Sequence, residues 1–208
     1  MIEIIPTILN KDFKEVKESI KKVENYVNWV QLDIMDGIFV NNETWNNPDD
    51  LKKIDSKVKI EAHLMIDKPI EKINDWLDMV DRVIIHFESS KDQEIKEIIK
   101  RAKDKKKGIG LAINPETHFS VVTPFLNDLD LVLIMTVQPG FGGQEFKEFN
   151  LKKIKALRRI WKNGNIEIDG GVNNINIKRI KKAGANLICS GSYIFNNSNI
   201  EKAIKSLK

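Results

Sequence analysis

The sequence lacks several features that would place it in particular protein classes. It contains one cysteine, Cys189, in 208 residues, so no internal disulfide can form and we expect a reducing, cytoplasmic location. No apolar run approaches the roughly 20 residues that a membrane-spanning helix needs, so we expect no membrane partner. The first residues, MIEIIPTIL, lack the basic region and the cleavage site of a signal peptide, so we expect no secretion.

The sequence also lacks a large excess of either basic or acidic residues. The 34 basic and 30 acidic residues leave a net charge of +4, which is too small to favour a nucleic-acid partner. Lysine and glutamate instead interleave in segments such as KDFKEVKESIKKVE, as they do on solvated helix faces. Hydrophobic residues make up 41% of the chain, and no linker or low-complexity tract divides it. We therefore expect one domain over residues 1–208.

The pattern that is present is an alternation of short β-branched runs with amphipathic segments. It predicts strands over 2–9, 29–35, 58–66, 82–87, 108–113, 130–137, 165–169 and 186–190. It predicts helices over 11–26, 70–80, 92–105, 146–162, 173–183 and 199–207, and a short one near 118–126. Asparagine and aspartate predict a loop at 41–50, so the segment 37–57 holds at most a short or irregular helix.

Strands that alternate with helices favour a parallel sheet covered by helices. Eight such units close into a (β/α)8 TIM barrel, for which this chain is compact. The rival architecture, an open doubly wound sheet, would carry a glycine-rich turn after its first strand. The first strand here ends in TILNKDF, which contains no glycine. The sequence therefore predicts an α/β protein with a single-domain TIM barrel.

Polar side chains interrupt the apolar strands near their carboxyl ends, where TIM-barrel enzymes carry out their chemistry. Asp33 and Asp169 each follow an apolar strand residue, and Gln31 and His63 are expected at an equivalent depth. One imidazole and two carboxylates make a suitable ligand set for a divalent cation. Either aspartate alone is equally well explained by a helix cap or a pairing with lysine. His86 fits a hydrogen-bonded wall histidine as well as a substrate contact.

Glycines follow the last three predicted strands, as PGFGG at 139–143, GG at 170–171 and GS at 191–192. Glycine lets backbone N–H groups approach an anion closely, and the loops after the last strands of TIM barrels commonly bind phosphate. Tight turns would explain any one of these loops. The three together favour a phosphorylated small molecule.

Seven stretches of the chain also match a known pattern. They are PTIL (6–9), LDIMDGIFV (32–40), AHLMI (62–66), INPET (113–117), IMTVQPGFGGQEF (134–146), IDGGV (168–172) and SGSYIF (190–195). With them the chain resembles the ribulose-phosphate 3-epimerase family nearly end to end. The resemblance implies a homo-oligomeric isomerase of the pentose phosphate pathway. Such an enzyme interconverts D-ribulose 5-phosphate and D-xylulose 5-phosphate through a metal-stabilised enediolate.

The resemblance assigns roles to individual residues. Asp33 and Asp169 match the two acid/base aspartates of the family, which are also metal ligands. His63 matches a ligand histidine, and Gln31 occupies the position of another. The implied cofactor is a divalent cation, namely zinc, manganese, iron or magnesium. The implied substrate-binding residues are Thr7, His63, Gly140, Phe141, Gly142, Gly143, Gly170, Gly171, Gly191 and Ser192. The resemblance also implies that three methionines line the reaction centre, namely Met35, Met65 and Met135.

Three positions depart from the family pattern. Gln31 stands where family members usually have a ligand histidine, and an amide oxygen binds borderline metals less well than imidazole does. Thr7 replaces a serine, and FVNN at 39–42 replaces FVPN. Two alternative functions follow. One is an epimerase of a longer sugar such as allulose 6-phosphate. The other is a weakly active barrel that binds a sugar phosphate, which Gln31 favours and the two retained aspartates oppose.

Overall fold

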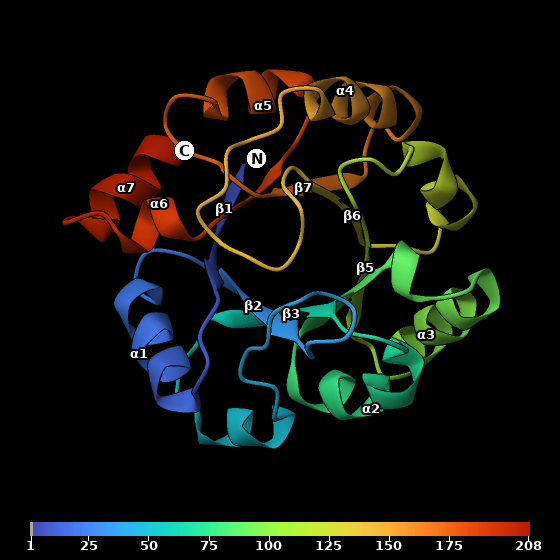
Figure 1. The fold of residues 1–208 in the computed structure, drawn as a ribbon, viewed down its shortest axis with the longest axis horizontal. Helices are drawn as coiled ribbons and strands as arrows, with labels where there is room; N and C mark the ends of the chain where they lie inside the picture. Colours follow the sequence, from blue (N-terminus) through green and yellow to red (C-terminus); the bar gives the residue numbers. More distant parts are fainter. Residues whose placement is uncertain (1) are drawn as a thin grey trace.

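Residues 2–208 form a closed barrel of eight parallel strands in the computed structural model, with helices around the outside (Figure 1). Each strand pairs with its neighbours in chain order, and the first pairs with the last. The strands are β1 (Glu3–Ile8), β2 (Trp29–Met35), β3 (Lys59–Met65), β4 (Arg82–His86), β5 (Gly108–Ile113), β6 (Leu131–Met135), β7 (Asn165–Asp169) and β8 (Leu187–Ser190). The predicted single-domain TIM barrel is thus confirmed.

Amphipathic helices cover the barrel. They are α1 (Phe13–Val23), α2 (Pro69–Met79), α3 (Asp92–Asp104), α4 (Asn150–Ile160), α5 (Ile177–Ala183), α6 (Ser192–Phe195) and α7 (Ile200–Leu207), with the 3₁₀ helices η1 (Pro48–Lys53), η2 (Phe87–Ser89) and η3 (Phe119–Phe125). Helix α1 shows how the sequence specifies them. The Asp12 side chain accepts a hydrogen bond from the Glu15 N–H, which caps the first turn, and Val16, Ile20 and Val23 are buried on one face.

The strands are buried on both faces, so alternate residues have different surroundings. Outward residues such as Leu32 and Ile34 join the large apolar core beneath the helices. Inward residues fill the barrel, and the strand register sets their level. It places Asp33 beside His63, and Met135 beside Asp169. The residues singled out from the sequence therefore lie near one another at the carboxyl ends of the strands.

The differences from the sequence prediction lie between the strands. The segment predicted as a helix near 118–126 is the 3₁₀ helix η3, which contains Pro124. The helix predicted from residue 173 begins at Ile177, because the Asn173 side chain accepts backbone hydrogen bonds in a turn before it. Helix α6 was not predicted, and the irregular segment 37–57 contains η1. Within residues 2–208, no helix has the length and apolar character needed to cross a membrane.

Candidate active site

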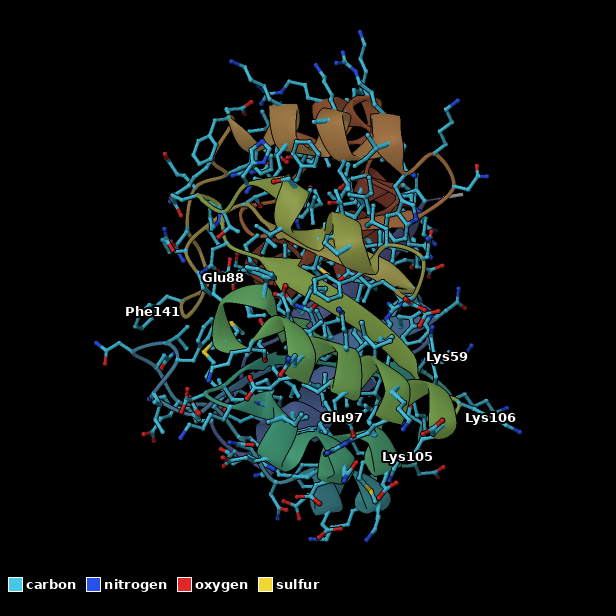
Figure 2. The ribbon with its side chains drawn as sticks, turned by 90° about the vertical axis from the view of Figure 1, so that its right-hand side faces the viewer. Lys59, Glu88, Glu97, Lys105, Lys106 and Phe141 are labelled. Carbon is cyan, nitrogen blue, oxygen red and sulfur yellow. The ribbon has the colours of Figure 1, made fainter. Side chains whose placement is uncertain are left out.

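A cavity of about 530 Å³ opens at the carboxyl ends of the strands. The loop between β6 and α4, yellow to orange in Figure 1, passes across this mouth of the barrel. In Figure 2, Phe141 of that loop lies at the same end of the barrel as Glu88, whereas Lys59 lies at the opposite end. The cavity therefore occupies the end at which TIM-barrel active sites are found.

Most of the predicted site residues line this cavity. The structure brings the following to its wall: Thr7, Asp33, Met35, Met65, Met135, Gly140, Phe141, Gly142, Gly143, Asp169, Gly170, Gly171, Gly191 and Ser192. Gln31 and His63 do not line it, because both are fully buried beneath its floor. The methionines predicted from the resemblance give that floor an apolar, polarisable surface around the two carboxyl groups.

Two aspartates from different strands meet at the floor of the cavity. Asp33 on β2 and Asp169 on β7 are joined by Gln31, whose Nε2 donates hydrogen bonds of 2.9 Å to Asp33 Oδ1 and to Asp169 Oδ2. The Gln31 oxygen is turned away and accepts a hydrogen bond from the Cys189 thiol at 3.3 Å. In this arrangement Gln31 presents N–H groups, and not the ligand oxygen expected from the sequence, because each of the two carboxyl groups accepts one hydrogen of its amide nitrogen.

Burial shifts the pKa values of both carboxyl groups upward. Desolvation raises the pKa of Asp33 to about 7, although the hydrogen bond from Gln31 acts in the opposite direction. Desolvation and the neighbouring charge of Asp33 raise the pKa of Asp169 to about 7. Near neutral pH this pair can hold one proton on either side, which suits groups that exchange the roles of acid and base.

Two buried histidines continue the polar network away from the aspartates. His63 Nδ1 lies 3.1 Å from Asp33 Oδ1, and His63 Nε2 lies 2.9 Å from His86 Nε2. His86 Nδ1 in turn faces Glu88 Oε2 at 3.3 Å. Burial lowers the pKa of each histidine to about 4, so both rings are neutral at pH 7. Of the two readings of His86 left open by the sequence, the structure shows the hydrogen-bonded wall histidine.

The backbone of the glycine loops adopts conformations that residues with a side chain rarely adopt. Gly140, Gly143, Gly170 and Gly171 all have positive φ angles between 66° and 120°. A Cβ on Gly171 would lie 2.5 Å from the Phe146 backbone nitrogen, so the chain approaches itself too closely there for any other residue. These loops surround one side of the cavity, as expected for an anion site after the last strands.

Comparison with known proteins decides the family. The sequence model of the ribulose-phosphate 3 epimerase family matches residues 3–195. Ribulose-phosphate 3-epimerase of Bacillus subtilis is 35% identical over 217 residues, covering 100% of this chain and 99% of that protein. The Schizosaccharomyces pombe protein of the same name is 33% identical over 213 residues, covering 99% of this chain and 92% of that protein. The chain belongs to the ribulose-phosphate 3-epimerase family.

Solved structures of other proteins share the fold of this family member. A crystal structure of KGPDC from Streptococcus mutans superposes with a TM-score of 0.77 at 13% identity, covering 100% of this chain and 96% of the other. A 3-hexulose-6-phosphate synthase structure gives a TM-score of 0.73 at 17% identity, covering 99% and 98% of the two chains. At these identities the likeness shows the barrel fold alone.

Three side chains of the site could hold a metal ion. One ligand atom each from Asp33, His63 and Asp169 lies within 4.8 Å of the others, and all three residues are buried. The hydrogen-bond count also leaves room for a cation. Two carboxyl oxygens, Asp33 Oδ1 and Asp169 Oδ2, and one imidazole nitrogen, His63 Nδ1, surround the Gln31 amide nitrogen, which supplies only two N–H donors. The donor set fits a divalent cation that accepts both oxygen and nitrogen ligands.

A second polar cluster lies deeper in the barrel, and sequence analysis missed it. Arg82 forms an ion pair with Glu61 and lies 3.6 Å from a carboxyl oxygen of Glu167, while Cys189 Sγ lies 3.3 Å from Glu167 Oε1. Burial raises the pKa of both glutamates, and for Glu167 the charge of Glu61 adds to this effect. Strand alternation could have identified this cluster from the sequence. Glu61 and Glu167 precede His63 and Asp169 by two residues, so they share the inward face of their strands.

Proposed function

We propose that this protein is a ribulose-phosphate 3-epimerase that interconverts D-ribulose 5-phosphate and D-xylulose 5-phosphate. The observation that carries the proposal is the pair of buried carboxyl groups, Asp33 and Asp169, at the floor of the cavity. Inversion at a carbon next to a carbonyl needs a base on one face of the substrate and an acid on the other. Relatives with this activity in their names match the chain over its full length.

The two aspartates would act in turn. In one direction Asp33 takes the proton from carbon 3 while Asp169 returns a proton to the opposite face, and the roles exchange in reverse. In the metal-free site the pKa values of about 7 would let each group accept and release a proton near physiological pH, and the charge of a bound cation would lower both values. Gln31 would hold the two carboxyl groups in register through its paired N–H donors.

A divalent cation, namely zinc, manganese, iron or magnesium, would be held by Asp33, His63 and Asp169. Such an ion stabilises negative charge on the substrate oxygens as the enediolate forms. Met35, Met65 and Met135 would exclude water from the reacting carbon. Thr7 and the loops at 140–143, 170–171 and 191–192 would bind the remainder of the sugar phosphate through hydroxyl and backbone N–H groups.

One assay tests the proposal against both alternatives. Purified protein is supplied with ribulose 5-phosphate or allulose 6-phosphate, and inversion of carbon 3 is followed for each by NMR. Turnover of the pentulose that exceeds turnover of the hexulose at least tenfold supports the proposed substrate. The reverse preference identifies a hexulose-phosphate epimerase, and binding of both sugars without turnover identifies a binding protein. The pathway, the cytoplasmic location and the homo-oligomer stay predictions.

A further inference from the structure

The β6–α4 loop, residues 136–149, crosses the mouth of the barrel with an unpacked tip (Figure 1). Its residues 138–144 line the cavity. A Cβ added at Gly142 or Gly143 would meet no atom within 4 Å, and Phe141 is 57% exposed. The position of the tip therefore depends on contacts that the loop makes elsewhere.

Glu116, in the neighbouring loop after β5, contacts both ends of the β6–α4 loop. Its Oε2 accepts a hydrogen bond from Gln138 Nε2 at 2.7 Å, and its Oε1 forms an ion pair with Lys147 Nζ at 2.8 Å. The hydrogen bond from Lys147, together with that from Gln138, holds the pKa of Glu116 below its usual range. One charged carboxylate therefore joins the start of the loop to its end.

Two further side chains carry this support to the tip. Gln144 Nε2 donates hydrogen bonds to the carbonyl oxygens of Gln138 and Phe141, at 2.7 Å and 2.8 Å. From the loop after β2, Asn42 Nδ2 donates to the Gly140 carbonyl oxygen at 2.7 Å. Because β2 lies opposite β6 in the barrel, this second support comes from the far side of the mouth.

These supports leave the backbone donors of the tip free. Within residues 2–208, the N–H groups of Phe141, Gly142 and Gly143 donate no hydrogen bond to another part of the protein. Free, adjacent backbone N–H groups are what an anion such as phosphate requires. The loop is thus held by side chains and carbonyl groups, while its donors remain available for a ligand.

The turn that carries Glu116 is itself fixed. Lys153 on α4 donates from Nζ to the carbonyl oxygens of Asn114 and Pro115, at 2.9 Å and 2.7 Å. The Thr117 N–H donates to the Asn114 carbonyl oxygen at 3.1 Å and closes the turn. Glu116 does not line the cavity, so it can act on a small ligand only through the β6–α4 loop.

We propose that Glu116 is a positioning residue that holds both ends of the β6–α4 loop, so that the free N–H groups of the tip are preorganised for the phosphate group of the substrate. The phosphate rests on the proposed function, whereas the hold on the loop does not. A single contact of an exposed carboxylate is weak. Glu116 acts on both ends of one loop, and a ligand that binds an ordered loop loses less conformational entropy.

The first experiment measures the order of the loop without a ligand. Chymotrypsin cleaves after phenylalanine, and cleavage after the exposed Phe141 requires the chain around it to open locally. Glu116→Ala should raise this cleavage rate about 3- to 10-fold, the scale of two exposed contacts. Mass spectrometry of the two fragments measures the rate, and an unchanged rate would overturn the proposal. This readout requires neither activity nor phosphate.

The second experiment measures the consequence for the ligand. In Glu116→Ala, the KM for ribulose 5-phosphate and the dissociation constant of inorganic phosphate should both rise about 3- to 10-fold. The kcat, and the slow reaction of ribulose without its phosphate, should stay within about twofold of wild type, because only the phosphate end is affected. An equal loss of rate with both sugars would show a general structural role and overturn the proposal.

A failure of the proposed function is distinguishable from a failure of this inference. If the wild-type protein neither binds phosphate nor turns over ribulose 5-phosphate, the proposed function fails, and the cleavage rates alone decide whether Glu116 holds the loop. The matched control is Glu201→Ala. Glu201 pairs with Lys205 on the outer helix α7 and is exposed to a similar degree, so it should leave every readout unchanged.

Exchanging the charges provides a rescue. Glu116→Lys should loosen the loop further, because it places two cations together at Lys147. Adding Lys147→Glu restores an ion pair of the opposite sense, and the Gln138 amide can turn its oxygen to the new cation. Cleavage rate and KM should then return toward the wild-type values. If the double variant stays as impaired as Glu116→Lys, the contact between these two positions does not hold the loop.

Discussion

The Gln31 amide on β2 donates a 2.9 Å hydrogen bond across the barrel to the Asp169 carboxyl group on β7. The same nitrogen reaches Asp33, so one side chain holds both carboxyl groups. The amide oxygen of Gln31 lies on the other side, 3.3 Å from the Cys189 sulfur. The residue that replaces a ligand histidine of the family pattern therefore acts here as a hydrogen-bond clamp.

The first prediction concerns the acid/base pair. Asp169→Asn keeps the shape of the side chain but removes its ability to transfer a proton, so epimerisation should fall by about 10²- to 10⁴-fold. The circular dichroism spectrum should be unchanged. The exposed Asp49→Asn, on the outer helix η1, is the control and should retain full activity. A purified Asp169→Asn protein with near-normal turnover would remove Asp169 from the reaction.

The second prediction concerns the glycine loops. Ribulose without its phosphate should react far more slowly than ribulose 5-phosphate, because binding energy from the distant phosphate helps to position carbon 3. Inorganic phosphate should partly restore the rate with ribulose by occupying the loops beside Gly142 and Gly143. Progress curves with each sugar measure both effects. Equal rates for the two sugars would show that these loops do not bind phosphate.

The third prediction concerns the cluster deep in the barrel. Replacing Arg82 by methionine leaves two buried glutamates without their cation, so the free energy of unfolding should fall by roughly 3–5 kcal/mol. Arg179 pairs with Glu148 on the surface, where both side chains are more than half exposed, and Arg179→Met should cost less than about 1 kcal/mol. Urea denaturation measures both changes. Similar losses for the two variants would mean that the deep ion pair does not stabilise the barrel.

The strands were predictable because their apolar runs are near-continuous. Alternation predicts Asp33 and His63 on the inward face, whereas their common level comes from the register of β2 and β3, which the apolar pattern does not specify. The direction of the Gln31 amide could not be predicted, because it depends on the Asp169 carboxyl group, 138 residues away in the chain. The alternation of the fourth strand predicts His86 and Glu88 on one face, whereas the structure ends β4 at His86 and places Glu88 in η2, where its side chain still reaches His86.

The fourth prediction concerns stability against pH in chelator-treated protein. Burial raises the pKa of Asp33 and of Asp169 from 3.8 to about 7, so between these values the folded chain binds more protons than the unfolded chain. Their contribution to stability is complete below pH 4 and is lost as pH rises to 7. Asp169→Asn should therefore be more stable than wild type at pH 8, by at most about 4 kcal/mol, with a smaller difference at pH 5. Thermal unfolding across this range measures the difference, and a constant difference would contradict the assignment.

The last prediction concerns the metal preference that Gln31 confers. With Gln31 acting as a clamp, Asp33, His63 and Asp169 remain as ligands, and a set rich in oxygen favours manganese or magnesium over zinc. Gln31→His restores an imidazole at this position and should raise zinc affinity about 10-fold or more. Isothermal titration of both proteins with zinc and manganese measures the change.

Gln31→Glu provides the matched control for this prediction, because it adds an oxygen ligand of similar length. It should strengthen manganese binding more than zinc binding, since carboxylates suit harder ions. The histidine variant should show the opposite selectivity. If the unchanged protein already binds zinc as tightly as Gln31→His, then the amide either turns its oxygen to the ion or has no effect on it. The hydrogen bonds from Gln31 to the two aspartates would then not determine the metal preference.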